Sequence, residues 1–182
     1  MAPRSRGAVG RLVIVVLLVT SCSGEDPSAE TAASTSTTVA TPVGSTPRVD
    51  LINEAVDALE TTLGGPQRFF EINATASLVN MIVSLNDGQL AQPWVYFDGG
   101  LSSSEPAEAT GFSFAASALD FDPDKVLGKL QAELPQSSPD LFFIEGGEGG
   151  VVRYSVAVTS QQGGQLIVVV GPDGTVLSVD PS

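Results

Sequence analysis

The pattern of hydrophobic and polar positions predicts two helices in this chain. From Asp50 to Leu63, apolar residues recur on one face at helical spacing. Gly64-Gly65-Pro66 then ends the helix, since glycine adopts the left-handed conformation at helix ends and proline cannot continue a helix. A second helix is predicted to begin at Asp122-Pro123-Asp124, which combines a capping carboxylate with a proline in the first turn. Pro135 ends it.

Alternation of apolar and polar residues predicts strands after each helix. Phe69–Leu85 alternates, with a change of phase near Leu78-Val79 that indicates a turn or bulge. A turn at Asn86-Asp87-Gly88 and a strand at Pro93–Phe97 follow. In the second half, the predicted strands are Leu141–Ile144, Val152–Val158, Leu166–Val170 and Val176–Val179, and the predicted turns are Gln161–Gly164 and Pro172-Asp173-Gly174.

Landmarks of the first half recur in the second half after about 75 residues. Gly88 matches Gly163, Asp98-Gly99 matches Asp173-Gly174, and the apolar positions of the two helices match as well. This agreement predicts an internal duplication. The predicted fold class is therefore α+β, with two repeated units of one helix and an antiparallel sheet, and with the helices packed on one face of a curved sheet.

The end of the second half resembles PepSY-type domains, which are secreted helix-plus-sheet modules of cystatin-like build. The residues that carry the resemblance are Tyr154–Val158, Leu166–Val170 and Asp173–Leu177, in the order strand, strand, Asp-Gly turn and strand. The first half departs from this pattern, because Pro93 stands where a central strand should run. At the level of the fold, the arrangement is also similar to the tandem helix-and-sheet β-lactamase inhibitory protein. Both resemblances imply protein binding or inhibition.

The N-terminus has the order of a secretory signal peptide, with basic residues between Arg4 and Arg11 followed by the apolar run Leu12–Val19. That run is too short to span a membrane as a helix. Val19-Thr20-Ser21-Cys22 resembles the lipobox of bacterial lipoproteins. The resemblance implies cleavage before Cys22, a diacylglyceryl (palmitate-type) lipid on its thiol, and attachment to the extracytoplasmic face of the cell membrane. An ordinary signal peptide with a chance cysteine is the alternative.

These patterns divide the chain into five segments. Residues 1–21 are the expected signal peptide, and residues 22–47 are a lipid-anchored tether rich in Ser, Thr, Ala and Pro, whose composition does not support a folded core. The expected first α+β repeat is 48–101, and the second is 120–182. Between them, residues 102–119 form a connector, in which Gly111–Ala115 is a candidate strand.

The charge of the chain limits its partners. It has 21 acidic and 8 basic residues, a formal net charge of −13. Such a surface repels phosphate backbones and anionic headgroups, so nucleic-acid binding is not expected. The expected partners are the membrane, through lipidated Cys22, and an extracytoplasmic protein. An acidic surface fits a basic partner or a cation, but it also fits an ordinary soluble surface.

The chemistry available to the chain is narrow. It has no histidine, which removes the commonest general base and every Ser-His or Cys-His nucleophile arrangement. Cys22 is its only cysteine. The alternating acids Asp120–Asp124 are spaced as in a calcium loop, but Lys125 and Gln131 stand where such a loop needs Gly and Glu. No enzyme, metal or cofactor is therefore predicted.

The aromatic pairs Phe69-Phe70 and Phe142-Phe143 are the remaining candidates. They fit core positions, but Phe70 and Phe143 would line an apolar pocket if the helices stood off the sheet. The leading hypothesis is a non-enzymatic, membrane-tethered module that binds another protein, with inhibition as one form of that binding. The alternative is a carrier or sensor of an apolar ligand such as a lipid.

Overall fold

The computed structural model describes residues 46–181. The expected signal peptide, the expected lipid site Cys22 and nearly all of the expected tether lie outside the described residues. The described residues belong to one compact unit of the chain, Ala40–Ser182.

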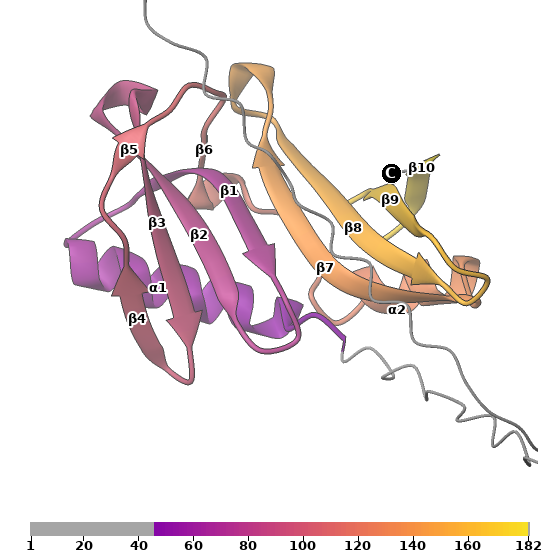
Figure 1. The fold of residues 1–182 in the computed structure, drawn as a ribbon. Helices are drawn as coiled ribbons and strands as arrows, with labels where there is room; N and C mark the ends of the chain where they lie inside the picture. The colour runs from indigo at the N-terminus through magenta and orange to yellow at the C-terminus, as the bar shows by residue number, and fades with distance from the viewer. Residues whose placement is uncertain (1–45, 182) are drawn as a thin grey trace, which may run out of the picture. The chain divides into compact units, whose positions relative to one another are not determined.

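In the described part of the chain, two α-helices each precede a run of antiparallel strands (Figure 1). The first half consists of the 3-10 helix η1 (Val49–Leu51), α1 (Ile52–Leu63), β1 (Arg68–Ala74), β2 (Val79–Leu85), the 3-10 helix η2 (Asn86–Gly88), β3 (Leu90–Phe97) and β4 (Gly100–Ser103). The middle consists of β5 (Ala107–Glu108), β6 (Phe114–Ala115) and the 3-10 helix η3 (Ala116–Ala118). The second half consists of α2 (Val126–Glu133), β7 (Ser137–Gly146), the 3-10 helix η4 (Glu148–Gly150), β8 (Val152–Ser160), β9 (Gln165–Val170) and β10 (Val176–Pro181). The predicted α+β class is confirmed.

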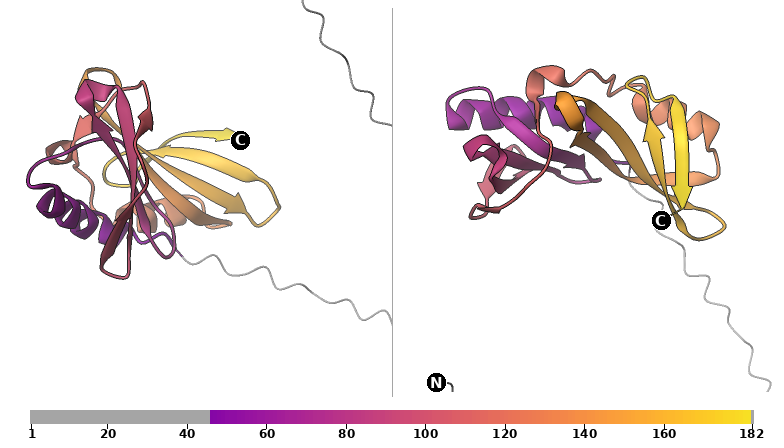
Figure 2. Two further views of the ribbon diagram at one scale, coloured as in Figure 1. Left: turned by 60° about the vertical axis from the view of Figure 1, so that its left-hand side comes forward. Right: turned by 90° about the horizontal axis from the view of Figure 1, so that it is seen from above.

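The strands of residues 46–181 form one ten-stranded sheet in the order β10-β9-β8-β7-β1-β2-β3-β4, with β5 on β3 and β6 on β1. Its neighbouring strands run antiparallel. The halves meet where β1 pairs with β7, with Ile72 opposite Ile144. Figure 2 shows a strong twist, so that β3 and β4 at one end point in a different direction from β9 and β10 at the other.

Helix α1 follows the predicted pattern. Its apolar face is buried, and Leu59 has no exposed surface. Gly64 ends the helix in the left-handed conformation, with φ 80°. The Gly64 N–H donates to the Glu60 carbonyl, as the glycine and proline signals predicted.

Helix α2 begins later than the sequence signals alone would place it. Asp122 does hold the segment just before the helix in place. Its carboxylate accepts the Asp124 N–H at 3.1 Å, and its carbonyl accepts the Val126 N–H at 2.9 Å. The residues after Asp122 form turns, and the helix itself starts at Val126. Val126, Leu127 and Leu130 bury the predicted apolar face.

Pro93 lies inside β3, where proline was expected to disturb a central strand. Its place explains why it is tolerated. On one side β3 pairs with β2 throughout, and on the other its partner changes at Pro93 from β5 to β4. In this gap the Pro93 carbonyl accepts the Ser104 N–H at 3.0 Å. A ladder that is already interrupted loses little when proline removes a donor.

Alternate strand positions and one face of each helix contribute to a single buried apolar core. On β8, Tyr154, Val156 and Val158 are buried, and across from them on β9 stand Val170, Val168 and Leu166. Aromatic rings fill the interior: Phe69 packs on Phe114 with centroids 5.9 Å apart, and Phe121 contacts both Phe142 and Tyr154.

Candidate functional site

Phe70 and Phe143, the residues predicted to line an apolar pocket, lie in different surroundings. Phe143 is half-buried on the sheet face away from the core, between Asn73 of β1 and Ser155 of β8. Phe70 lies at a bulge in β1, and its ring stands 3.5 Å from where a Cβ on Gly111 would be. A pocket lined by both residues stays a prediction.

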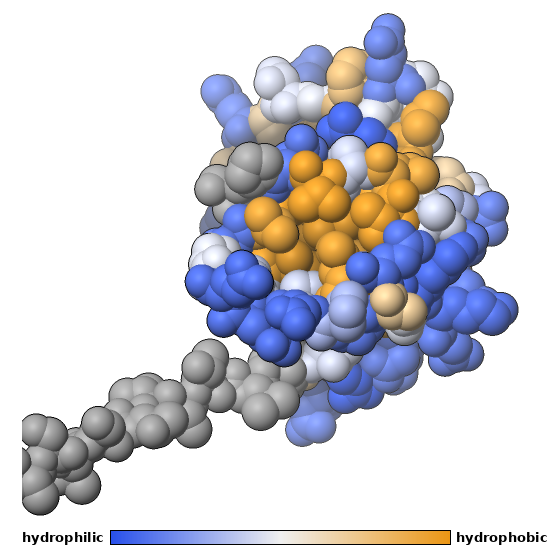
Figure 3. Space-filling model, turned by 90° about the vertical axis from the view of Figure 1, so that its right-hand side faces the viewer, coloured by the Kyte–Doolittle hydropathy of each residue, from blue (hydrophilic) through white to orange (hydrophobic). Residues whose placement is uncertain are grey.

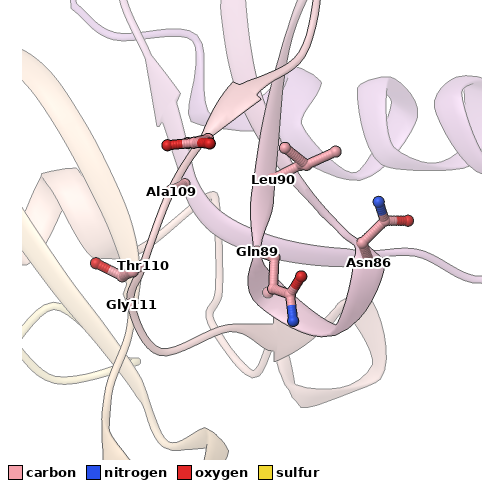
Figure 4. Close-up of a pocket in the computed structure, with 8 residues that line it drawn as sticks. Asn86, Gln89, Leu90, Ala109, Thr110 and Gly111 are labelled. Carbon is pink, nitrogen blue, oxygen red and sulfur yellow. The ribbon is translucent and has the colours of Figure 1, made fainter.

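A groove with a volume of about 710 Å³ opens beside η2. Its lining includes Asn86, Gln89, Glu108 and Thr110. Figure 4 shows the Asn86 and Thr110 side chains on opposite sides of this groove, pointing away from each other. These two polar groups therefore do not converge on one position, as the polar groups of a site for a small polar ligand do.

The acids near the start of α2 are used within the fold. Lys125 Nζ lies 2.5 Å from the Asp122 carboxylate, and this hydrogen bond lowers the Asp122 pKa. Among residues 46–181, no cluster of three or more acidic, cysteine or histidine side chains is placed to hold a metal ion.

A second polar cluster joins α2 to the turn between β9 and β10. Lys129 Nζ lies 2.7 Å from the Asp173 carboxylate and 2.5 Å from the Thr175 hydroxyl. The Asp173 carboxylate also accepts the Thr175 hydroxyl and N–H. The lysine first, and then the threonine, hold the pKa of Asp173 well below its usual range. These groups satisfy one another, so the cluster stabilises the fold rather than presenting free chemistry.

The hairpin of β9 and β10 carries apolar side chains that the fold leaves uncovered. On β9 and β10 these are Ile167, Val169, Leu177 and Val179, here called the apolar hairpin surface, while Leu166 and Val176 pack against the core. Leu177 is 65% exposed and Val179 is 42% exposed, while the others are half-buried. Figure 3 shows a broad area of hydrophobic residues on the side of the molecule where these last strands lie.

The register shows that both faces of this hairpin are apolar. Val176 and Val179 stand opposite Val170 and Val168, on the face that carries the core. Ile167 and Val169 belong to the other face, opposite Ala157 and Ser155 of β8. A strand that is apolar on both faces is typical of a sheet covered on both sides. Here β10 is the edge strand, and β9 is next to it.

A shallow groove of about 390 Å³ adjoins this surface at Val169 and Leu177. Val152, Val169 and Leu177 supply apolar lining, and Asp120 and Arg153 supply one charge of each sign. Because the groove is open rather than enclosed, a convex apolar group fits it better than an enclosed ligand does.

Most basic residues of the described part have partners. Arg48 pairs with Asp50 and Lys125 with Asp122, while Arg68 hydrogen-bonds to Ser113. Lys129 is held by Asp173, as described above. Most acidic residues between positions 46 and 181, in contrast, have no basic partner, so this part of the chain has an excess of unpaired negative charge.

The sequence predicted the acidic balance but not the apolar hairpin surface, although the uninterrupted apolar run Leu166–Val170 was its signal.

Comparison with known proteins found no family model, no curated protein and no solved structure that matches this chain. Within residues 46–181, neither helix has the length and apolar character needed to cross a membrane.

Proposed function

We propose that this protein is a non-enzymatic binding module, tethered to the outside of the cell membrane through lipidated Cys22, that binds another extracytoplasmic protein. The observation that carries the proposal is the apolar hairpin surface. Contiguous apolar area that the fold leaves uncovered marks an interaction site in soluble proteins, because leaving it in water costs free energy.

The proposed architecture is a tandem pair of PepSY-like units with their helices on one face of the sheet. Matching turns support it: Gly88 and Gly163 have φ of 87° and 89°, and Gly99 and Gly174 have φ of 75° and 84°. Each pair is separated by about 75 residues, which is the offset of the sequence repeat. The same helix-then-four-strand order on both sides of the connector also supports it. A fold of this kind is compatible with protein binding but does not specify it.

The test is cross-linking of the full chain in intact cells that produce it, with an affinity tag placed in the tether. We expect one extracytoplasmic protein to be recovered reproducibly with the chain and to bind it again when the two are purified separately. If repeated captures recover only abundant background proteins, the proposal is wrong.

Native mass spectrometry of the same material tests the carrier alternative. A lipid retained at a fixed ratio across preparations would replace the binding-module proposal. The buried rings of Phe69, Phe114 and Phe142 occupy the interior that such a ligand would need, so we expect a mass without bound lipid apart from the anchor.

A further inference from the structure

We infer that the partner docks on the apolar hairpin surface and presents a segment that is apolar at its centre and basic at its margin. This inference rests on the proposed function. This assigns a place on the molecule and a partner chemistry to the binding function. The most exposed positions, Leu177 and Val179, form the centre of the docking surface, and Asp180 and Asp120 form its acidic margin.

The apolar part of the inference follows from exposure and register. Leu177 is at a bulge in β10 and lines the groove together with Val169, so the edge strand and its neighbour both contribute apolar side chains there. Its side chain can be covered only by something outside the described residues. Centres of protein interfaces are apolar, with charged groups kept to the rim.

The basic part follows from charge complementarity. The chain has a formal charge of −13, and Asp180 stands in β10 opposite Ile167 of the hairpin surface. Arg153 is the one basic side chain along the groove. Glu145 of β7 stands opposite it in the sheet. A partner with Lys or Arg around an apolar centre would be steered to this surface, and an acidic partner would be repelled.

A second copy of this chain is a poorer occupant. Two copies would bring the same negative charge together. The outer strand is also poorly suited to pairing with itself, because β10 has a bulge between Val176 and Ser178 and ends in Asp180-Pro181. Bulges, charges and proline are the features that prevent edge-to-edge association of sheets.

A lipid surface is also a poorer occupant. The unburied apolar residues of β9 and β10 are all aliphatic, with no aromatic and no basic residue among them. Surfaces that insert into headgroup regions combine aromatic and basic residues, and anionic lipids repel a negatively charged protein.

Site-specific photo-cross-linking in intact cells tests the inference. A benzophenone amino acid replaces Leu177 or Val179 in the full chain, and matched controls carry it at Phe97 or Phe112, which are 58% and 56% exposed. We expect protein adducts from positions 177 and 179 and few from the controls. The captured peptide, sequenced by mass spectrometry, should contain Lys or Arg beside apolar residues.

Variants then separate the two parts of the inference. With the cross-linker at position 179, Leu177→Ser should lower the adduct yield by about tenfold, the loss expected for one interface leucine, while Phe97→Ser should not change it. Asp180→Lys should lower the yield several-fold, whereas Glu105→Lys, a matched exposed acid far along the chain, should not.

Several results would overturn the inference. Adducts as strong from Phe97 as from Leu177 would place the partner elsewhere while leaving the proposed function intact. Captured lipid, a captured second copy, a segment of the same chain, or an acidic peptide would each replace the inferred partner. An absence of protein adducts from all four positions, together with no protein recovered by chemical cross-linking, would remove the proposed function itself.

Discussion

Gly174 lies directly against the backbone of Val126, with no room for a side chain between them. A Cβ atom at position 174 would overlap the Val126 carbonyl oxygen and lie 2.8 Å from the Val126 Cα. Gly174 belongs to the turn between β9 and β10, and Val126 is the first residue of α2. The contact therefore fixes the hairpin against the start of the helix, beside the proposed docking surface.

Replacing Gly174 with alanine should lower the free energy of unfolding by about 3 kcal/mol. The substitution combines a positive φ, which costs a non-glycine residue about 1 kcal/mol, with an overlap that forces the backbone to move. Chemical denaturation of the full chain measures the loss.

Gly99→Ala is the matched control. Gly99 has a similar φ of 75°, but a Cβ there would have nothing within 4 Å. Gly99→Ala should therefore lower the free energy of unfolding only by the conformational contribution of the positive φ, about 1 kcal/mol. Equal losses at the two positions would mean that the contact with Val126 does not restrain the turn.

Asp173 makes the same region sensitive to acid. Its pKa is lowered in the folded state by Lys129 and Thr175, so it stabilises the fold above its usual pKa of 3.8 and loses that contribution as the pH falls from there toward the lower folded value. Asp173→Asn should lower the urea midpoint at pH 7. The difference from the unmodified chain should shrink steadily below pH 3.8.

Asp98→Asn serves as the comparison for that series. Asp98 precedes Gly99 as Asp173 precedes Gly174, and no hydrogen bond or ion pair holds its carboxylate among the described residues. Its urea midpoint at pH 7 should therefore equal that of the unmodified chain. A constant difference for Asp173→Asn from pH 7 to pH 2 would contradict the role of its charge.

Much of the local structure follows from short-range rules that the sequence displays. The end of α1 at Gly64, the turns at Gly163 and Gly174, and the alternation along β8 all depend on residues close together in the chain. The pairing of β1 with β7 does not. Alternation tells which face a side chain takes but not which strand lies beside it, and these two strands are far apart in sequence.

The short strands and the candidate site could not be predicted from the sequence, for a related reason. β4 has the residues Gly-Leu-Ser-Ser and β5 only Ala107–Glu108, too few for a period to be recognised. Leu166–Val170 was recognised as an apolar strand. That it lies one strand from the sheet edge, with Val169 and Ile167 uncovered, depends on the order of all the other strands.

Tyr154 supports the connection into α2 through a single hydrogen bond. The Asp120 N–H donates to the Tyr154 hydroxyl at 2.9 Å, while the ring packs against Phe121 and Phe142. Tyr154→Phe keeps the packing but leaves that N–H without its partner, so it should cost about 1 kcal/mol of unfolding free energy.

Tyr96→Phe is the comparison for this variant. The Tyr96 hydroxyl donates to the Glu54 carboxylate at 2.5 Å. Asp120 and Glu54 are both exposed, so water reaches either partner once the hydroxyl is lost, and the expected cost is similar, about 1 kcal/mol of unfolding free energy. Denaturation curves measure both losses, and a loss above about 3 kcal/mol for either variant would contradict this account.

Cys22 gives the prediction that concerns location. If its thiol carries a diacylglyceryl group, two acyl chains hold the protein stably in the membrane, whereas one chain would bind only marginally. Cys22→Ser should therefore move the chain from the detergent phase to the aqueous phase in a phase-separation assay and abolish incorporation of labelled palmitate. Ser21→Thr, which keeps the cysteine and a small neighbour, should still be anchored. If the unmodified chain incorporated no labelled palmitate, or if the serine variant incorporated as much label as the unmodified chain, the lipoprotein assignment would be wrong.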